Sequence, residues 1–249
     1  MTNGCYKAIE AGDASNNAGN YSAALDQFNQ VLSQCKAYDA KEKGNAGKAT
    51  ALNGLKQYND ALAAASAGLS ANKTSVDNLF QKANAELGLK MNTEAKADFA
   101  QIIDLTSKNR NTKDRATIYA KIAEIDLRQD MYSDATNNVQ SAIALDNTNA
   151  DFYILKGDVY LAQNDYTNAM SAYDEAITAG GNTSKVWTAK IEAETKAYQK
   201  KYAAGSNAAD LANKMSAADK KSFCNDIAAA KSNGIKNQSI DLLQLAICK

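Results

Sequence analysis

The 249-residue sequence contains no proline and no histidine. The absence of proline removes the strongest helix breaker and favours an almost purely helical protein, whose turns then depend on glycine and asparagine. The absence of histidine excludes Ser-His-Asp and Cys-His catalytic groups and histidine-ligated metals, because each of them needs an imidazole. Carboxylates are therefore the main residues left for catalysis.

Net charge and long apolar runs are also lacking. Lys plus Arg and Asp plus Glu both number 28, so the charge balance indicates neither nucleic acid nor an anionic membrane as a partner. No apolar run approaches the ~20 residues needed to cross a bilayer. With 45% hydrophobic residues, the chain can bury a core in one domain, in two domains or in an elongated array.

The sequence does contain a repeated segment. GNYSAALDQFNQVL, which begins at Gly19, recurs in varied form as KQYNDALAAASAGL, DMYSDATNNVQSAI and NDYTNAMSAYDEAI. The repeats align on five alanines that are 37, 34, 40 and 34 residues apart, namely Ala24, Ala61, Ala95, Ala135 and Ala169. A basic period of 34, with extra residues in Asn/Lys-rich loops, predicts a stack of repeated helix pairs.

Two stripes of packing residues are predicted in each repeat. An apolar or small residue follows each aligned alanine at positions four and seven, which places all three on one face of a helix. These triples are Ala24, Phe28, Val31; Ala61, Ala65, Gly68; Ala95, Phe99, Ile102; Ala135, Val139, Ala142; and Ala169, Tyr173, Ala176. Twelve residues before each alanine stands another small residue, namely Gly12, Ala49, Ala83, Ala123 and Gly157. Each unit is therefore predicted to be a helix, a short turn and an antiparallel helix, with these residues in the core.

The pattern resembles the tetratricopeptide repeat, and ADFYILKGDVYLAQNDYTNAMSAYDEAITAGGN is the best-matching unit. The resemblance implies an all-α, right-handed α-solenoid of about five helix-turn-helix units, a sixth first helix and a C-terminal helical hairpin as a cap. The predicted repeat array covers residues 1–203, and the predicted cap covers 204–249. The units are expected at about 5–38, 42–75, 76–109, 116–149 and 150–183, with a partial unit at 184–203.

The four cysteines occupy hairpin-related positions. Cys5 stands 13 residues before the first turn and Cys35 13 residues after it, and Cys224 and Cys248 flank the last turn in a similar way. Residues equidistant from a turn lie side by side in an antiparallel hairpin, so the spacing predicts disulfides Cys5–Cys35 and Cys224–Cys248. The alternative is four buried free thiols in a cytoplasmic protein. A zinc site is less favoured, because no Cys-x-x-Cys occurs.

Disulfides imply an oxidising compartment, although Met1 is followed at once by a predicted helix without a signal peptide. We therefore expect an exported, periplasmic or cell-envelope protein whose export signal has been removed. The tail, DKKSFCNDIAAAKSNGI followed by a terminal CK, resembles the cysteine-paired endings of exported tetratricopeptide proteins from Bacteroidetes-type bacteria.

The resemblance also implies a scaffold or adaptor whose first helices line a concave groove that binds a peptide or helix of a partner protein. On each first helix, the residues that follow the packing stripe by one position form a row that is predicted to line the groove. Nine residues of this row are predicted to bind the partner: Asp13, Phe80, Asn84, Leu87, Glu124, Leu127, Ile154, Asp158 and Glu192. This row is apolar with acidic residues at its centre, so we expect an apolar partner segment with Lys or Arg flanks. Ile9 and Asp13 stand where a clamp for carboxylates would need Lys and Asn, which disfavours such a clamp.

Other interpretations of the sequence remain open. The groove residues could be ordinary solvated or inter-repeat packing residues. The protein could be a structural subunit of a periplasmic or outer-membrane assembly complex. A carboxylate-based glycoside hydrolase is less favoured, because nothing marks one acid as desolvated or paired. No enzymatic activity, cofactor, metal or nucleic-acid partner is expected.

Overall fold

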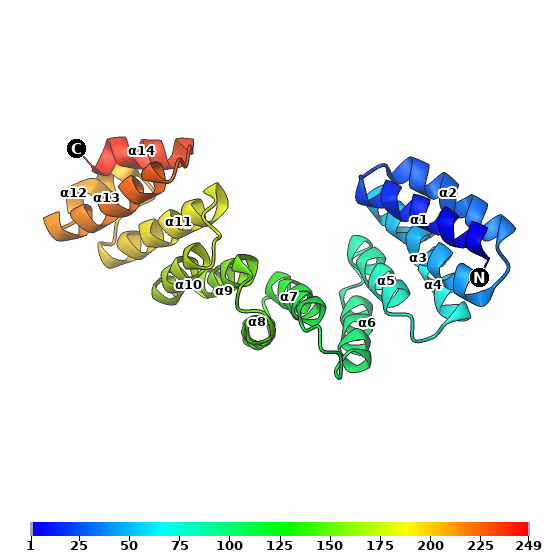
Figure 1. The fold of residues 1–249 in the computed structure, drawn as a ribbon. Helices are drawn as coiled ribbons and strands as arrows, with labels where there is room; N and C mark the ends of the chain where they lie inside the picture. Colours follow the sequence, from blue (N-terminus) through cyan, green and yellow to red (C-terminus); the bar gives the residue numbers. More distant parts are fainter. Residues whose placement is uncertain (1, 249) are drawn as a thin grey trace. The chain divides into compact units, whose positions relative to one another are not determined.

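The computed structural model describes residues 2–248, and the described part consists of fourteen helices without strands. The helices form two compact units, unit 1 (Met1–Asn111) and unit 2 (Thr112–Lys249). Within unit 1, and in unit 2 up to residue 201, helices that follow one another in the chain lie side by side (Figure 1). The all-α solenoid of helix pairs expected from the sequence is confirmed.

Unit 1 contains three helix pairs. Its helices are α1 (Asn3–Asn17), α2 (Tyr21–Gln34), α3 (Tyr38–Gly54), α4 (Tyr58–Ala71), α5 (Val76–Gly88) and α6 (Asn92–Leu105). Each helix packs on the next, and α3 also packs on both α1 and α5. The first helices of the three pairs therefore form one layer and the second helices form the other.

Unit 2 continues the same pattern and then departs from it. Its helices are α7 (Lys113–Arg128), α8 (Tyr132–Leu145), α9 (Ala150–Ala162), α10 (Tyr166–Thr178), α11 (Ser184–Lys201), α12 (Ala208–Lys214), α13 (Ala217–Ser232) and α14 (Gln238–Ile247). The first helices α7, α9 and α11 pack in sequence, as α1, α3 and α5 do in unit 1.

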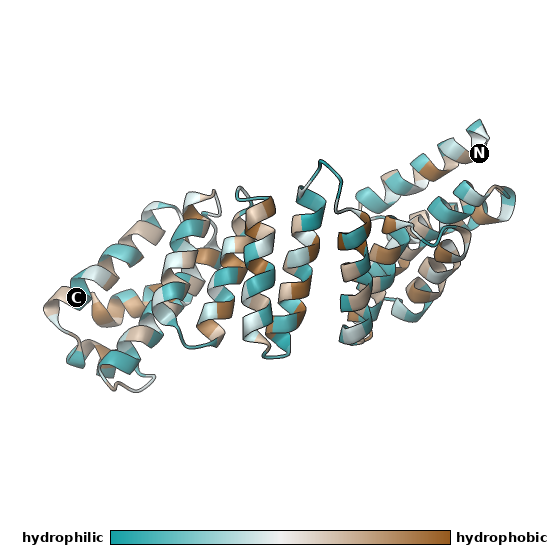
Figure 2. Cartoon of the chain, turned by 90° about the horizontal axis from the view of Figure 1, so that it is seen from below, coloured by the Kyte–Doolittle hydropathy of each residue, from teal (hydrophilic) through white to brown (hydrophobic). Residues whose placement is uncertain are grey.

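The predicted packing stripes form the core of both units. All fifteen residues of the second-helix triples are buried, and so are the five small residues of the first helices. A Cβ at Gly12 would overlap the ring of Phe28, and a Cβ at Gly157 would overlap the ring of Tyr173. The small residue is needed because the aromatic ring of the second helix occupies the space beside its backbone. Figure 2 shows the resulting amphipathic helices, which carry both hydrophobic and hydrophilic residues.

Every helix pair turns at the same repeat position, five residues before the aligned alanine. That residue has a positive φ of 57° to 73° in all five turns, namely Gly19, Lys56, Lys90, Asp130 and Asn164. The next N–H donates to the carbonyl five residues earlier, as from Met91 to Glu86 over 2.8 Å, which is the Schellman arrangement. Only two of the five turn residues are the glycine or asparagine expected from the sequence; Lys and Asp occupy the others.

Both predicted cysteine pairs are disulfides in the structure. The Cα atoms of Cys5 and Cys35 lie 6.0 Å apart, and those of Cys224 and Cys248 lie 5.6 Å apart. The first disulfide joins α1 to the end of α2 within unit 1, and the second joins α13 to the end of α14 within unit 2.

The C-terminal region differs from the sequence prediction in one element. The sequence predicts no matching second helix after α11 and then a closing hairpin; the seven-residue helix α12 is an additional element between α11 and this hairpin. Leu211, Ala212 and Met215 bury this short helix in a cluster with Ile191 of α11. This helix packs on α14 rather than pairing with α11, so it is an additional element of the C-terminal region and not the second helix of a sixth repeat.

The division of the chain into units lies elsewhere than the predicted domain boundary. The two compact units meet in sequence between residues 111 and 112, in the Asn/Lys-rich loop after α6. The boundary expected between residues 203 and 204 stays a prediction.

Candidate protein-binding cleft

A cleft of about 400 Å³ lies within unit 2, on the layer formed by α7, α9 and α11. Seven residues line it: Glu124, Leu127 and Arg128 of α7, Asp151, Leu155 and Asp158 of α9, and Lys185 of α11. Glu124, Leu127 and Asp158 are three of the predicted groove residues. The structure brings them together because each follows a packing residue on its own first helix and so lies at the edge of the core.

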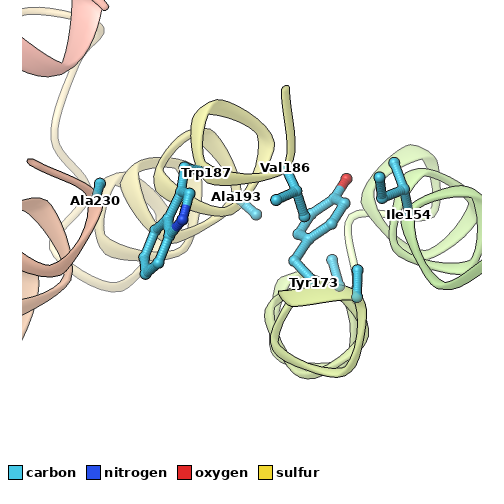
Figure 3. Packing of buried hydrophobic residues seen from close by; sticks show 8 residues of the cluster. Ile154, Tyr173, Val186, Trp187, Ala193 and Ala230 are labelled. Carbon is cyan, nitrogen blue, oxygen red and sulfur yellow. The ribbon is translucent and has the colours of Figure 1, made fainter. Parts of the chain in front are cut away.

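Asp158 is the most buried charged residue of the cleft. The Tyr173 hydroxyl donates a hydrogen bond to its Oδ1 over 2.8 Å. Burial raises the pKa of Asp158; the hydrogen bond and the charge of Lys185 oppose this shift, and the charge of Glu192 adds to it. Figure 3 shows the Tyr173 ring between Val186 and Ile154, so this carboxylate is held by a residue of the core.

Two other acids of the groove row, Glu124 and Glu192, are exposed and paired within their own helices. Glu124 lies 3.3 Å from Arg128, and Glu192 lies 2.8 Å from Lys196. Exposed pairs of this kind contribute about 0–1 kcal/mol to stability. A partner's basic group can therefore compete for these carboxylates at little cost to the fold.

Ile154 does not belong to the cleft. Its side chain is 3% exposed and packs in the core cluster with Tyr173 and Val186, so in this structure it contacts the core. The spacing placed Ile154 beside the groove because it stands three residues before Gly157, but the side chain packs into the core cluster.

The remaining predicted residues lie at other places. Asp13 is exposed on α1, where desolvation and then the like charge of Asp77 raise its pKa. On α5, Phe80 packs on Phe99 with ring centroids 6.1 Å apart, and Asn84 and Leu87 are half-buried. Glu192 lines a smaller cleft of about 290 Å³, whose other lining residues come from α11 and α14.

Four cleft residues were not predicted from the sequence: Arg128, Asp151, Leu155 and Lys185. Asp151, Leu155 and Asp158 are spaced by four and three, and Arg128 stands four residues after Glu124. Helical spacing from the predicted acids would have found these three residues. Lys185 carries no such signal, because it reaches the cleft from the first turn of the next repeat.

Comparisons with known proteins agree with this architecture. The tetratricopeptide repeat family matches residues 150–179, which contain α9 and α10. PilF of Pseudomonas aeruginosa is similar in structure with a TM-score of 0.68 and 12% identity, over 97% of this chain and 96% of that chain. A tetratricopeptide repeat protein of Parabacteroides merdae has a TM-score of 0.63 and 12% identity over the whole of both chains.

A third similar structure is YrrB, described as a tetratricopeptide repeat protein with an unusual peptide-binding site. Its TM-score is 0.56 and its identity 13%, over 88% of this chain and 95% of that chain. No curated protein matches the sequence. The family match shows a tetratricopeptide repeat at residues 150–179, and the structural likeness shows that the chain has the α-solenoid fold of tetratricopeptide-repeat proteins.

The described residues contain neither a candidate metal site nor a candidate membrane span. No group of three or more Cys, Asp or Glu side chains in residues 2–248 is placed to hold a metal ion. No helix in that range combines the length and the apolar character that a membrane span requires.

Proposed function

We propose that the protein is a non-enzymatic interaction module, and that the unit 2 cleft binds a peptide or helix of a partner protein. The observation that carries this proposal is the convergence of Glu124, Leu127 and Asp158 in one cleft on the layer of first helices. Repeat solenoids offer extended surfaces of this kind for binding.

The residues of the cleft favour a partner segment of mixed character. Leu127 and Leu155 offer apolar contacts, and Glu124, Asp151 and Asp158 favour Lys or Arg beside them. Electrostatic complementarity of this kind sets specificity and association rate more than affinity. We propose a second contact region in unit 1 for a partner segment of the same mixed character. It consists of Asp13, Phe80, Asn84 and Leu87.

Selection of peptides from a random library tests this proposal. We expect wild-type protein to enrich segments that combine apolar and basic residues, and Asp158→Lys to lose that enrichment. Asp134→Lys is the matched control, because Asp134 is an exposed acid on α8 outside the cleft. Equal enrichment by wild type and the Asp158 variant would contradict the proposal.

We propose binding rather than catalysis because Glu124 is exposed and paired with Arg128, which leaves no desolvated acid–base pair in the cleft. A permanent role in a periplasmic or outer-membrane complex would instead give one partner at fixed stoichiometry in native purifications.

We further propose that the protein works in an oxidising compartment, where its two disulfides persist. Protein isolated from its native host after alkylation of free thiols should yield both cross-linked peptide pairs. Recovery of four alkylated thiols would place the protein in a reducing compartment.

A further inference from the structure

A second cleft of unit 2, of about 420 Å³, lies between α10, α11 and α13. Its lining residues are Thr167, Met170, Ser171 and Asp174 of α10, Lys190, Glu194, Ala197 and Tyr198 of α11, and Ser222 and Asp226 of α13. It shares no lining residue with the cleft proposed to bind peptides. Its chemistry is therefore independent of that proposal.

Lys190 links the three helices of this second cleft. Its Nζ lies 2.7 Å from Asp174 of α10 and 3.1 Å from Asp226 of α13, and its side chain is 9% exposed. Burial alone lowers the pKa of Lys190, but the hydrogen bond to Asp174 and the charge of Asp226 outweigh it and raise the pKa. Lys190 is therefore a charged residue whose two partners are already in place.

Glu194 stands one turn after Lys190 and forms side-chain hydrogen bonds with Tyr198 and with the like-charged Asp226, whereas Lys190 acts on it through its charge alone. Glu194 is 4% exposed, and its Oε2 atom has no hydrogen-bond partner within the described chain. An unsatisfied buried oxygen destabilises the folded state, and a charged group does so more strongly than a neutral one. Burial, followed by the charge of Asp226, raises the pKa of Glu194 to about 8.

The charges of the cleft do not balance. Asp174, Asp226 and Glu194 are three carboxyl groups against the single ammonium of Lys190. Lys190 already bonds to both aspartates, so its charge reaches Glu194 without a direct ion pair. The cleft has the volume of a small-ligand site, and the described residues offer no set of three ligands for a metal ion.

We propose that this cleft binds an organic monocation, a primary ammonium or a guanidinium group, which pairs with Glu194. Tyr198 and Met170 line the same cleft and offer an aromatic face and a thioether to the cation and its alkyl stem. The cation is either a free amine or a Lys or Arg side chain of a partner protein.

Binding of the cation releases a proton. Near neutral pH Glu194 is protonated, and pairing with the cation requires its carboxylate, so the Glu194 proton passes to the solvent while the cation keeps its charge. The charged and titratable groups that surround Glu194 are Lys190 and Tyr198 on α11, Asp226 on α13 and Asp174 on α10. Proton release should therefore approach one per bound cation near neutral pH and vanish well above the pKa of Glu194.

Trp187, the single tryptophan of the chain, provides the readout. Lys190 Nζ lies 5.4 Å from the centre of its ring, so a cation bound beside Lys190 should change the tryptophan fluorescence. The probes are butylammonium as a free amine and acetyl-Gly-Lys-Gly-amide as a protein side chain, with butanol and the norleucine peptide as uncharged controls. Calorimetry in two buffers of different protonation enthalpy measures the protons released by the wild-type protein.

Glu194→Gln keeps the shape of the side chain and removes its charge. We expect this variant to bind either probe about 10-fold more weakly or worse and to release no proton. Glu175→Gln is the matched control, because Glu175 lies on α10, pairs with Lys156 and does not line the cleft.

Binding of the peptide alone would identify the source as a protein side chain, and binding of butylammonium would show that a free amine suffices. The proposal is overturned if neither fluorescence nor calorimetry detects binding by wild-type protein. It is also overturned if wild type releases no proton on binding, or if Glu194→Gln binds as tightly as wild type.

Discussion

At the residue scale, the five repeat turns place the same demand on different side chains. A positive φ is easy for glycine but costs other residues about 1–2 kcal/mol, with less for asparagine. Lys56 and Lys90 adopt it at φ 60° and 63°, and their neighbours complete the same backbone hydrogen bonds as at Gly19. The helix-pair packing therefore imposes the turn on lysines that do not favour it.

Lys90→Gly should accordingly stabilise the protein, by about 0.5–1 kcal/mol after the entropy cost of glycine in the unfolded chain. Gln101→Gly in the exposed interior of α6 should destabilise it by about 1 kcal/mol, because no positive φ is relieved there. Denaturant midpoints at constant slope, followed by circular dichroism, measure both changes. A lower midpoint for Lys90→Gly would show that this turn carries no strain.

At the element scale, α11 joins the repeats to the C-terminal helices. Its buried face supplies Val186 and Trp187 to the cluster with α9 and α10, and Ile191 to the cluster with α12, α13 and α14. Lys190 bonds to α10 and α13 from the same helix, and Glu194 is buried beside these bonds. The docking of α13 is therefore coupled to the protonation of one carboxyl group.

The raised pKa of Glu194 predicts how the stability of unit 2 varies with pH. The folded chain keeps this proton up to about 8, whereas the unfolded chain loses it near the ordinary value of 4.5. The folded state binds more protons in this range, so the free energy of unfolding should fall as the pH rises, by at most about 1.4 kcal/mol per pH unit.

Glu194→Gln removes this contribution. The thermal midpoint of each protein can be followed by Trp187 fluorescence. The midpoint of the variant, relative to that of wild type, should therefore be higher at about pH 8.5 than at about pH 5. Asp13 and Asp158, whose pKa values are also raised, remain in both proteins and cancel in the comparison. A difference between the two proteins that does not change with pH would contradict the assignment.

At the scale of the whole molecule, each unit has its own disulfide. Cys5–Cys35 closes a loop with a sequence separation of 30, and Cys224–Cys248 one with a separation of 24. On the chain-entropy model each contributes roughly 3–4 kcal/mol. Both tie down helices at the ends of the described chain, where repeat arrays fray most readily.

Removal of each disulfide should act mainly on its own unit. Replacing Cys224 and Cys248 with serine should lower the denaturation midpoint reported by Trp187, because Trp187 belongs to unit 2. Replacing Cys5 and Cys35 with serine should lower the midpoint of the part of the circular dichroism transition that comes from unit 1. The midpoint reported by Trp187 should stay nearly unchanged. Equal shifts of the Trp187 midpoint in both double variants would show that the two units unfold together.

The sequence by itself determined the helix pairs, their register and the cysteine pairing. These features depend on periodic small residues and on counting outward from a turn, so Ala169, Tyr173 and Ala176 could be placed in the core without a structure. The same spacing placed Glu124 and Asp158 near one another, because both follow a first-helix packing residue.

Only the tertiary structure decided what each position contacts across helices. Ile154 packs in a core cluster with residues of α10 and α11, Lys185 reaches the cleft from the next repeat, and Glu194 lines a cleft with residues of α10 and α13. Short-range spacing carries no information on these contacts, because they depend on how helices from different repeats dock. Burial and charge at both clefts are therefore properties of the packed unit.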